Sequence, residues 1–110
     1  MTRRNDLRLE DIREACRTVL KLVARGRASF DSDLAILPAL ERLLEIIGEA
    51  AGALTEDARQ AYPTAPWRAV MRLRVLLAHH YHRVDRDQVW TIAERDVPTL
   101  LAALAQPEEG

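Results

Sequence analysis

Hydrophobic residues recur at three- and four-residue steps along almost the whole chain, and this periodicity limits how it can fold more than any other feature. In an α-helix such spacing gathers the apolar side chains on one face. No stretch of useful length alternates as a half-buried strand would. The pattern therefore predicts an all-α protein, an antiparallel bundle of four or five helices joined by short loops.

Start and stop signals divide this pattern into four main helices, which we predict near residues 7–25, 33–54, 66–81 and 86–105. Gly26 is a suitable stop for the first helix. Side-chain oxygens at positions 31–33 can cap the second. Pro38 falls in the first two turns of that helix, so the regular helix can begin there instead.

The second half of the chain carries its own signals. Thr55 can cap a short helical turn, and Pro66 suits the first turn of the third helix. Asp85 can cap the last helix. Pro98 should kink or split that helix, because proline lacks a backbone donor and clashes with the preceding turn.

Large apolar side chains define the predicted core, which includes Trp67, Leu73, Leu77 and Trp90. Additional apolar residues, among them Val75, widen the apolar face of the third helix, so we expect that helix to be buried on most of its circumference. The second half of the second helix is thin, in the sense that most of its side chains are small: it contains Gly48, Ala50, Ala51 and Gly52. Small residues allow another helix or backbone to approach closely there.

Length and cysteine content set broad limits. The 110 residues suffice for one domain, residues 1–110, with one hydrophobic core. The single cysteine, Cys16, excludes an internal disulfide and suits a reducing compartment, so we expect a cytoplasmic protein. The N-terminal residues lack an apolar run, and no segment has the length needed to span a bilayer. We therefore expect neither secretion nor membrane insertion.

Charge is unevenly divided along the chain, although the net charge is only −1. Residues 31–57 hold seven acidic side chains and one arginine, whereas residues 68–86 hold five arginines, three histidines and one aspartate. A locally basic segment of this kind fits a phosphate-bearing partner. The alternative is a solvated helix face without a partner.

The basic segment contains the run Arg74-Val-Leu-Leu-Ala-His-His-Tyr81, where a cation, imidazoles and a phenol cluster on an aliphatic background. On one helix, Arg74 and Tyr81 would fall nearly on one stripe, about 10 Å apart along the axis. His79 would point roughly 140° away from Arg74. These two residues share a pocket only if the helix ends near His79 or a second chain supplies the partner.

Several motifs occur in a fixed order: Leu43-Leu-Glu-Ile-Ile-Gly-Glu-Ala-Ala51, Pro66-Trp67, Arg74-x4-His79-x-Tyr81, Val84-Asp85 and Val89-Trp90. Together they closely resemble the HepT-like branch of the HEPN superfamily over nearly the whole chain. The resemblance implies an all-helical homodimer that acts as a metal-independent ribonuclease toxin. It also implies a minimal nucleotidyltransferase antitoxin that adenylylates the motif tyrosine.

By this resemblance, Arg74 and His79 take the catalytic positions and Tyr81 accepts AMP. The sequence departs from the family at Val75, where many members have a polar residue, often asparagine. Any hydrogen bond that this residue makes is lost, which bears on catalytic strength but not on the fold. Further candidates for substrate binding are Arg72, His80, His82 and Arg83, although histidines in such a run are more often merely solvated.

These residue types fit RNA cleavage through the ribose 2′-OH. His79 can exchange protons near neutral pH, and the planar guanidinium of Arg74 can bind two phosphate oxygens.

We expect no cofactor. His79 and His82 could share a metal ion with Asp85, but no second ligand cluster completes a site, so no metal is predicted. The absence of a glycine-rich phosphate loop and of a Gly-x-Ser-x-Gly elbow leaves NTPases and serine hydrolases without support.

The expected partners are an RNA substrate, a second copy of the chain and a cognate minimal nucleotidyltransferase antitoxin, with neither DNA nor a membrane among them. An alternative function is a non-catalytic helical binding module that partners or regulates a minimal nucleotidyltransferase. Both Val75 and the solvated-face alternative favour this second interpretation. Activity on RNA distinguishes the two.

Overall fold

The computed structural model describes residues 3–78 and 85–105, and all secondary structure in this part of the chain is helical. The elements in chain order are α1 (Arg3–Val23), α2 (Arg27–Ser32), α3 (Ile36–Ala53), α4 (Glu56–Gln60), α5 (Trp67–Ala78), α6 (Arg86–Thr91), the π-helical turn η1 (Ile92–Asp96) and α7 (Val97–Ala105). The prediction of an all-α bundle is confirmed.

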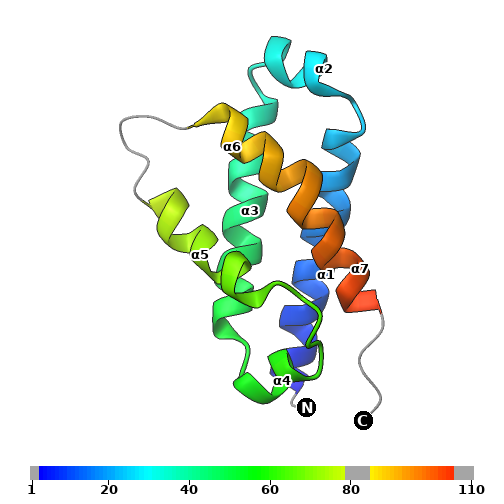
Figure 1. Cartoon of the computed structure of the whole chain (residues 1–110), viewed down its shortest axis with the longest axis vertical. Coiled ribbons are helices and arrows are strands. Elements are labelled where there is room, and N and C mark those ends of the chain that lie inside the picture. Colours follow the sequence, from blue (N-terminus) through cyan, green and yellow to red (C-terminus); the bar gives the residue numbers. More distant parts are fainter. Residues whose placement is uncertain (1–2, 79–84, 106–110) are drawn as a thin grey trace.

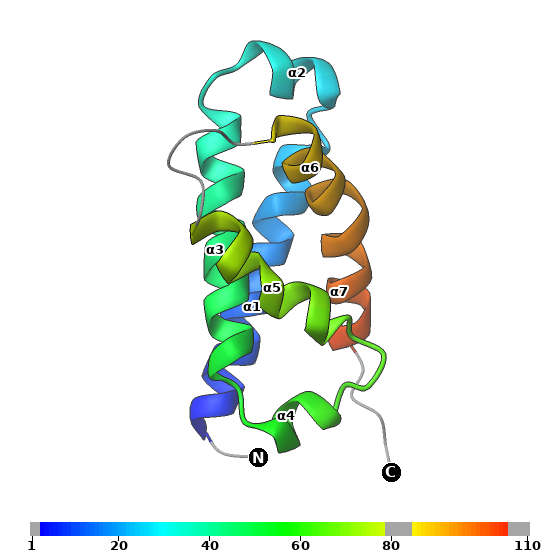
Figure 2. The same cartoon turned by 60° about the vertical axis from the view of Figure 1, so that its left-hand side comes forward.

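Helix α3 occupies the middle of the bundle, because it packs against α1 on one side and α5 on the other. It runs antiparallel to α1 (Figure 1), and α7 also packs against α1. The short helices α2 and α4 lie at opposite ends of the molecule (Figure 2). Within residues 3–78 and 85–105, no helix combines the length and apolar content needed to cross a membrane.

One hydrophobic core runs along the bundle, and its largest fully buried side chains include Ile12, Val19, Leu40, Leu44, Ile47 and Leu100. These residues repeat at three- and four-residue steps on their helices, as the periodicity predicted. The buried polar residue Asn5 is satisfied by Thr55: its amide nitrogen donates to Thr55 Oγ1 at 3.0 Å, and the Thr55 backbone N–H donates to Asn5 Oδ1. This pair fixes the start of α1 to the loop before α4.

Several helix ends differ from the prediction. Helix α1 begins four residues earlier than expected and ends at Val23, and the turn that follows contains Gly26, whose φ of 93° suits a residue without a side chain. The short α2 that follows was not predicted. Helix α3 begins at Ile36, between the two predicted starts. Pro38 is therefore its third residue, where the missing backbone donor has no intrahelical partner to lose.

The predicted caps of α4 and α6 are confirmed. Thr55 accepts a hydrogen bond from the Ala58 backbone at 3.3 Å, and Asp85 accepts one from the Gln88 backbone at 3.0 Å. The prediction that the last helix is interrupted near Pro98 is also confirmed. The interruption is the wider turn η1, immediately before α7.

The predicted core was only partly correct. Leu73 and Trp90 are buried, at 6% and 7% exposed, but Trp67 and Leu77 are only partly buried. The Trp67 indole N–H donates to the backbone oxygens of Arg59 at 2.9 Å and Tyr62 at 3.0 Å. These two bonds hold the ring near the end of α4, at the margin of the core.

Helix α5 is not buried on most of its circumference, so that prediction was wrong. It packs chiefly against α3 and lies at the edge of the bundle. Its outward residues are consequently exposed, among them Arg68, Arg72, Arg74 and Val75. The exposed fraction of Val75 reaches 60%. Helix α5 therefore buries one face and presents three arginines on the rest of its surface.

Candidate active site

The Arg74 side chain lies along the thin part of α3. A Cβ atom added at Gly48 would lie 3.1 Å from Arg74 Cγ and 3.2 Å from the Arg74 backbone nitrogen. A Cβ added at Gly52 would lie 3.1 Å from Arg74 Nη1. The two glycines therefore make room for this side chain from its stem to its guanidinium group.

The small residues of α3 face helix α5. They permit a close helix crossing, as predicted, and the element that approaches is α5 of the same chain, at Leu73 and Arg74. The thin segment is thus occupied within one chain. A second copy of the chain is not needed to cover it.

The guanidinium of Arg74 has no ion-pair or hydrogen-bond partner among residues 3–78 and 85–105. Arg42 on α3, by contrast, pairs with Glu45 at 2.6 Å. Exposure and the lack of a carboxylate within this part of the chain leave the positive charge of Arg74 available to an anion. An arginine in this state can bind two oxygens of a phosphate group.

Arg72 lies on a different side of α5. It lines a groove of about 930 Å³ between α5 and the segment from α6 to α7, together with Val75 on the same helix and Ile92 and Leu100 across the groove. Arg74 does not line this groove. Residues two apart on a helix point about 160° from each other. The structure therefore does not bring Arg72 and Arg74 together.

The other predicted site residues, His79, His80, Tyr81, His82 and Arg83, lie outside the described residues. Their roles stay predictions. The described chain stops at the end of α5 and resumes at Asp85, the cap of α6. What the structure establishes is how the two flanks of the motif are held.

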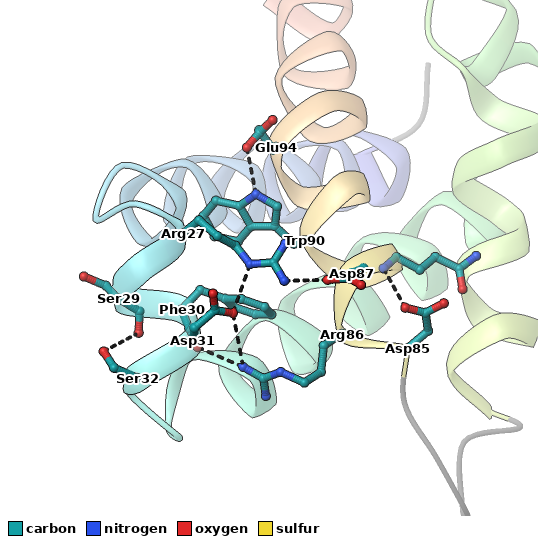
Figure 3. Close-up of polar contacts among 11 residues, drawn as sticks. Arg27, Ser29, Phe30, Asp31, Ser32, Asp85, Arg86, Asp87, Trp90 and Glu94 are labelled. Carbon is teal, nitrogen blue, oxygen red and sulfur yellow. Dashed lines mark hydrogen bonds and ion pairs between the residues drawn. The ribbon is translucent and has the colours of Figure 1, made fainter.

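The first turn of α6 is tied to α2 by ion pairs and ring contacts (Figure 3). Arg27 bonds to Asp31 at 3.0 Å and also to Asp87. The hydrogen bonds to Asp87 and then to Asp31 raise the pKa of the Arg27 guanidinium. Arg86 donates to the Phe30 backbone oxygen at 3.0 Å, and its guanidinium carbon lies 4.7 Å from the centre of the Phe30 ring.

Trp90 anchors the same region from inside. Its ring lies 5.0 Å from that of Phe30, centre to centre, and its indole N–H donates to Glu94 at 2.7 Å. Sequence reasoning missed this network. The i, i+4 spacing of Arg27 and Asp31 is the one signal that could have suggested part of it.

Cys16 is fully buried on α1, and burial raises the pKa of its thiol to about 12. The thiol is therefore structural and unreactive at neutral pH. In the described part of the chain, no group of three histidine, cysteine or acidic side chains is arranged to hold a metal ion.

Comparison with known proteins gives a consistent result. The family model described as "Ribonuclease HepT-like" matches residues 12–106. A relative from Methanocaldococcus jannaschii, named as a candidate RNase, is 34% identical over 93 residues, which cover 84% of this chain and 85% of the relative. A protein of Thermococcus cleftensis, named as a probable ribonuclease HepT, is 36% identical over 93 residues, 84% of each chain. No solved structure matches the chain.

Proposed function

Because the chain belongs to the ribonuclease HepT-like family, we propose that it is an endoribonuclease that cleaves RNA without a metal ion. The observation that supports this most directly is the state of Arg74. Its guanidinium is exposed, rests on the glycines of α3 and has no ion-pair partner within the described residues. Such a group suits the phosphate of a nucleic acid.

In the proposed reaction, the ribose 2′-OH loses its proton and attacks the adjacent phosphorus, and the bond from phosphorus to the 5′ oxygen breaks. His79 accepts the first proton or donates one to the departing 5′ oxygen. Arg74 binds two phosphate oxygens and stabilises the negative charge that develops on them. The products are a 2′,3′-cyclic phosphate and a 5′-OH end.

One histidine seldom serves both proton transfers, so the proposal includes a homodimer. A two-fold axis would place an Arg74–His79 pair from each copy around one cleft, and the two histidines could then act as base and acid. On one helix Arg74 and His79 point roughly 140° apart and cannot face the same ligand. In a dimer, Arg74 of one copy and His79 of the other could do so.

The purified protein is expected to cleave a mixed RNA pool in the presence of EDTA and to leave DNA intact, because the attacking group is the 2′-OH. Gel analysis and end-group chemistry should detect 2′,3′-cyclic phosphates, and light scattering on the same sample should report the dimer. The His79→Ala protein, purified in parallel, controls for contaminating nucleases.

Loss of activity in EDTA would contradict the metal-independent route. Intact RNA after incubation with protein free of AMP would favour the alternative, a non-catalytic helical module that partners or regulates a minimal nucleotidyltransferase. Val75 would then be the first residue to replace by asparagine.

The same proposal makes the chain the cytoplasmic toxin of a toxin–antitoxin pair, with Tyr81 accepting AMP from a cognate minimal nucleotidyltransferase. The Tyr81 phenol would attack the α-phosphorus of ATP and release pyrophosphate and a proton. A bulky anion there would compete with RNA for Arg74 and silence the enzyme.

Incubation with the partner and ATP is expected to add the mass of one AMP to the peptide that contains Tyr81, measured by mass spectrometry. Tyr62 is an internal control, because it is buried at 5% exposed and should gain nothing. An unmodified Tyr81 peptide, with a partner that hydrolyses ATP or modifies itself, would contradict the proposal.

A further inference from the structure

We propose that Gly48 and Gly52 are positioning residues for Arg74, because the space that they leave on α3 sets the direction of its guanidinium group. The catalytic part of this inference rests on the proposed function. Its geometric part rests on contacts alone and is tested separately below.

The contacts follow the side chain outward. Gly48 lies beneath its base: an added Cβ would meet Arg74 Cγ at 3.1 Å, the Arg74 backbone nitrogen at 3.2 Å and Leu73 Cβ at 3.2 Å. Gly52 lies one helical turn further and beneath the end: an added Cβ would meet Arg74 Nη1 at 3.1 Å and Cδ at 3.6 Å. The side chain therefore runs along α3 instead of extending straight into solvent.

Positioning by shape has a chemical advantage at this residue. A free arginine side chain has many rotamers, and their loss opposes binding. A carboxylate would restrict it but would also neutralise the charge that a phosphate needs. Among residues 3–78 and 85–105 no carboxylate pairs with Arg74, and the glycine backbone restricts it without neutralising it.

The two glycines differ in what they would disturb. A methyl group at Gly48 would press on the backbone of α5 and on Leu73, so it would move the helix crossing itself. A methyl group at Gly52 would meet only the flexible end of Arg74. Alanine also favours a helix more than glycine does. Gly52→Ala should therefore displace the guanidinium while preserving the fold.

The first test is a double-mutant cycle on RNA cleavage. Gly52→Ala is expected to lower the cleavage rate several-fold, because the added methyl group shifts the guanidinium by a few tenths of an ångström, with no fall in the thermal midpoint. In an Arg74→Ala background it should have no further effect. Ala53→Ser, on the exposed neighbouring residue, is the matched control and should cleave as wild type.

The inference is overturned if Gly52→Ala cleaves as wild type, or if it lowers cleavage equally with and without Arg74.

If wild-type protein does not cleave RNA, the proposed function fails, and a second test decides whether the glycines position Arg74. NMR relaxation of the arginine Nε–H groups should show a more ordered side chain at Arg74 than at exposed Arg72, and Gly52→Ala should abolish the difference. Equal mobility in the wild type, or no change in the variant, would contradict the positioning role.

Discussion

Replacing His79 by alanine is expected to lower RNA cleavage by about 10²- to 10⁴-fold, the usual cost of removing a positioned proton-transfer group. The measurement is the single-turnover cleavage rate of a defined RNA at several pH values around neutrality. Arg74→Lys should fail as well, because an ammonium group cannot reproduce the two parallel bonds of a guanidinium to phosphate. These are the largest functional effects that the proposed mechanism requires.

His82→Ala is the matched control, since it removes an imidazole three residues along the same run. Its effect should be much smaller. Retained activity in His79→Ala, with contamination excluded by a second purification, would remove His79 from the reaction. Retained activity in Arg74→Lys would show that a simple positive charge suffices and would count against a two-oxygen grip.

Replacing Trp90 by alanine should lower the free energy of unfolding by about 3–5 kcal/mol, the range typical for deleting a large buried aromatic side chain. The ring is 7% exposed, packs against Phe30 and donates its indole N–H to Glu94. Such a loss is a large part of the stability of a small domain. Urea unfolding followed by circular dichroism measures it directly.

Trp90→Phe separates the contributions, because it keeps an aromatic ring and loses only the indole donor and some volume. It should cost clearly less than Trp90→Ala. Trp67→Ala should also cost less, since that ring is only partly buried. A Trp90→Ala cost below that of Trp67→Ala would show that the junction of α2 and α6 is not a stabilising contact.

The sequence predicted the parts of the fold that depend on local pattern. Helices α1 and α3 are long enough to display their period over several turns, and Thr55 and Asp85 cap through bonds within three residues. Helix α2 has six residues, too few to show a period. It is held by contacts from α6, such as the bond from Arg86 to Phe30, 56 residues apart. No local signal could reveal that contact.

The candidate site divides in the same way. The residue types and spacing around Arg74 could be identified from the sequence, and so could the small side chains of α3 near Gly48 and Gly52. The contact of Arg74 with these two glycines could not be predicted from the sequence, because it depends on where α5 crosses α3. A local pattern identifies which residues can approach closely, but only tertiary packing decides which element approaches.

The burial of Cys16 has a practical consequence for spectroscopy. It is the only cysteine in the chain, and its inaccessible thiol stays protonated at the pH used for maleimide coupling. A cysteine introduced at an exposed position such as Val75 would then be the only thiol that takes up a fluorophore or spin label. The wild-type background can therefore serve for distance measurements without first removing its native cysteine.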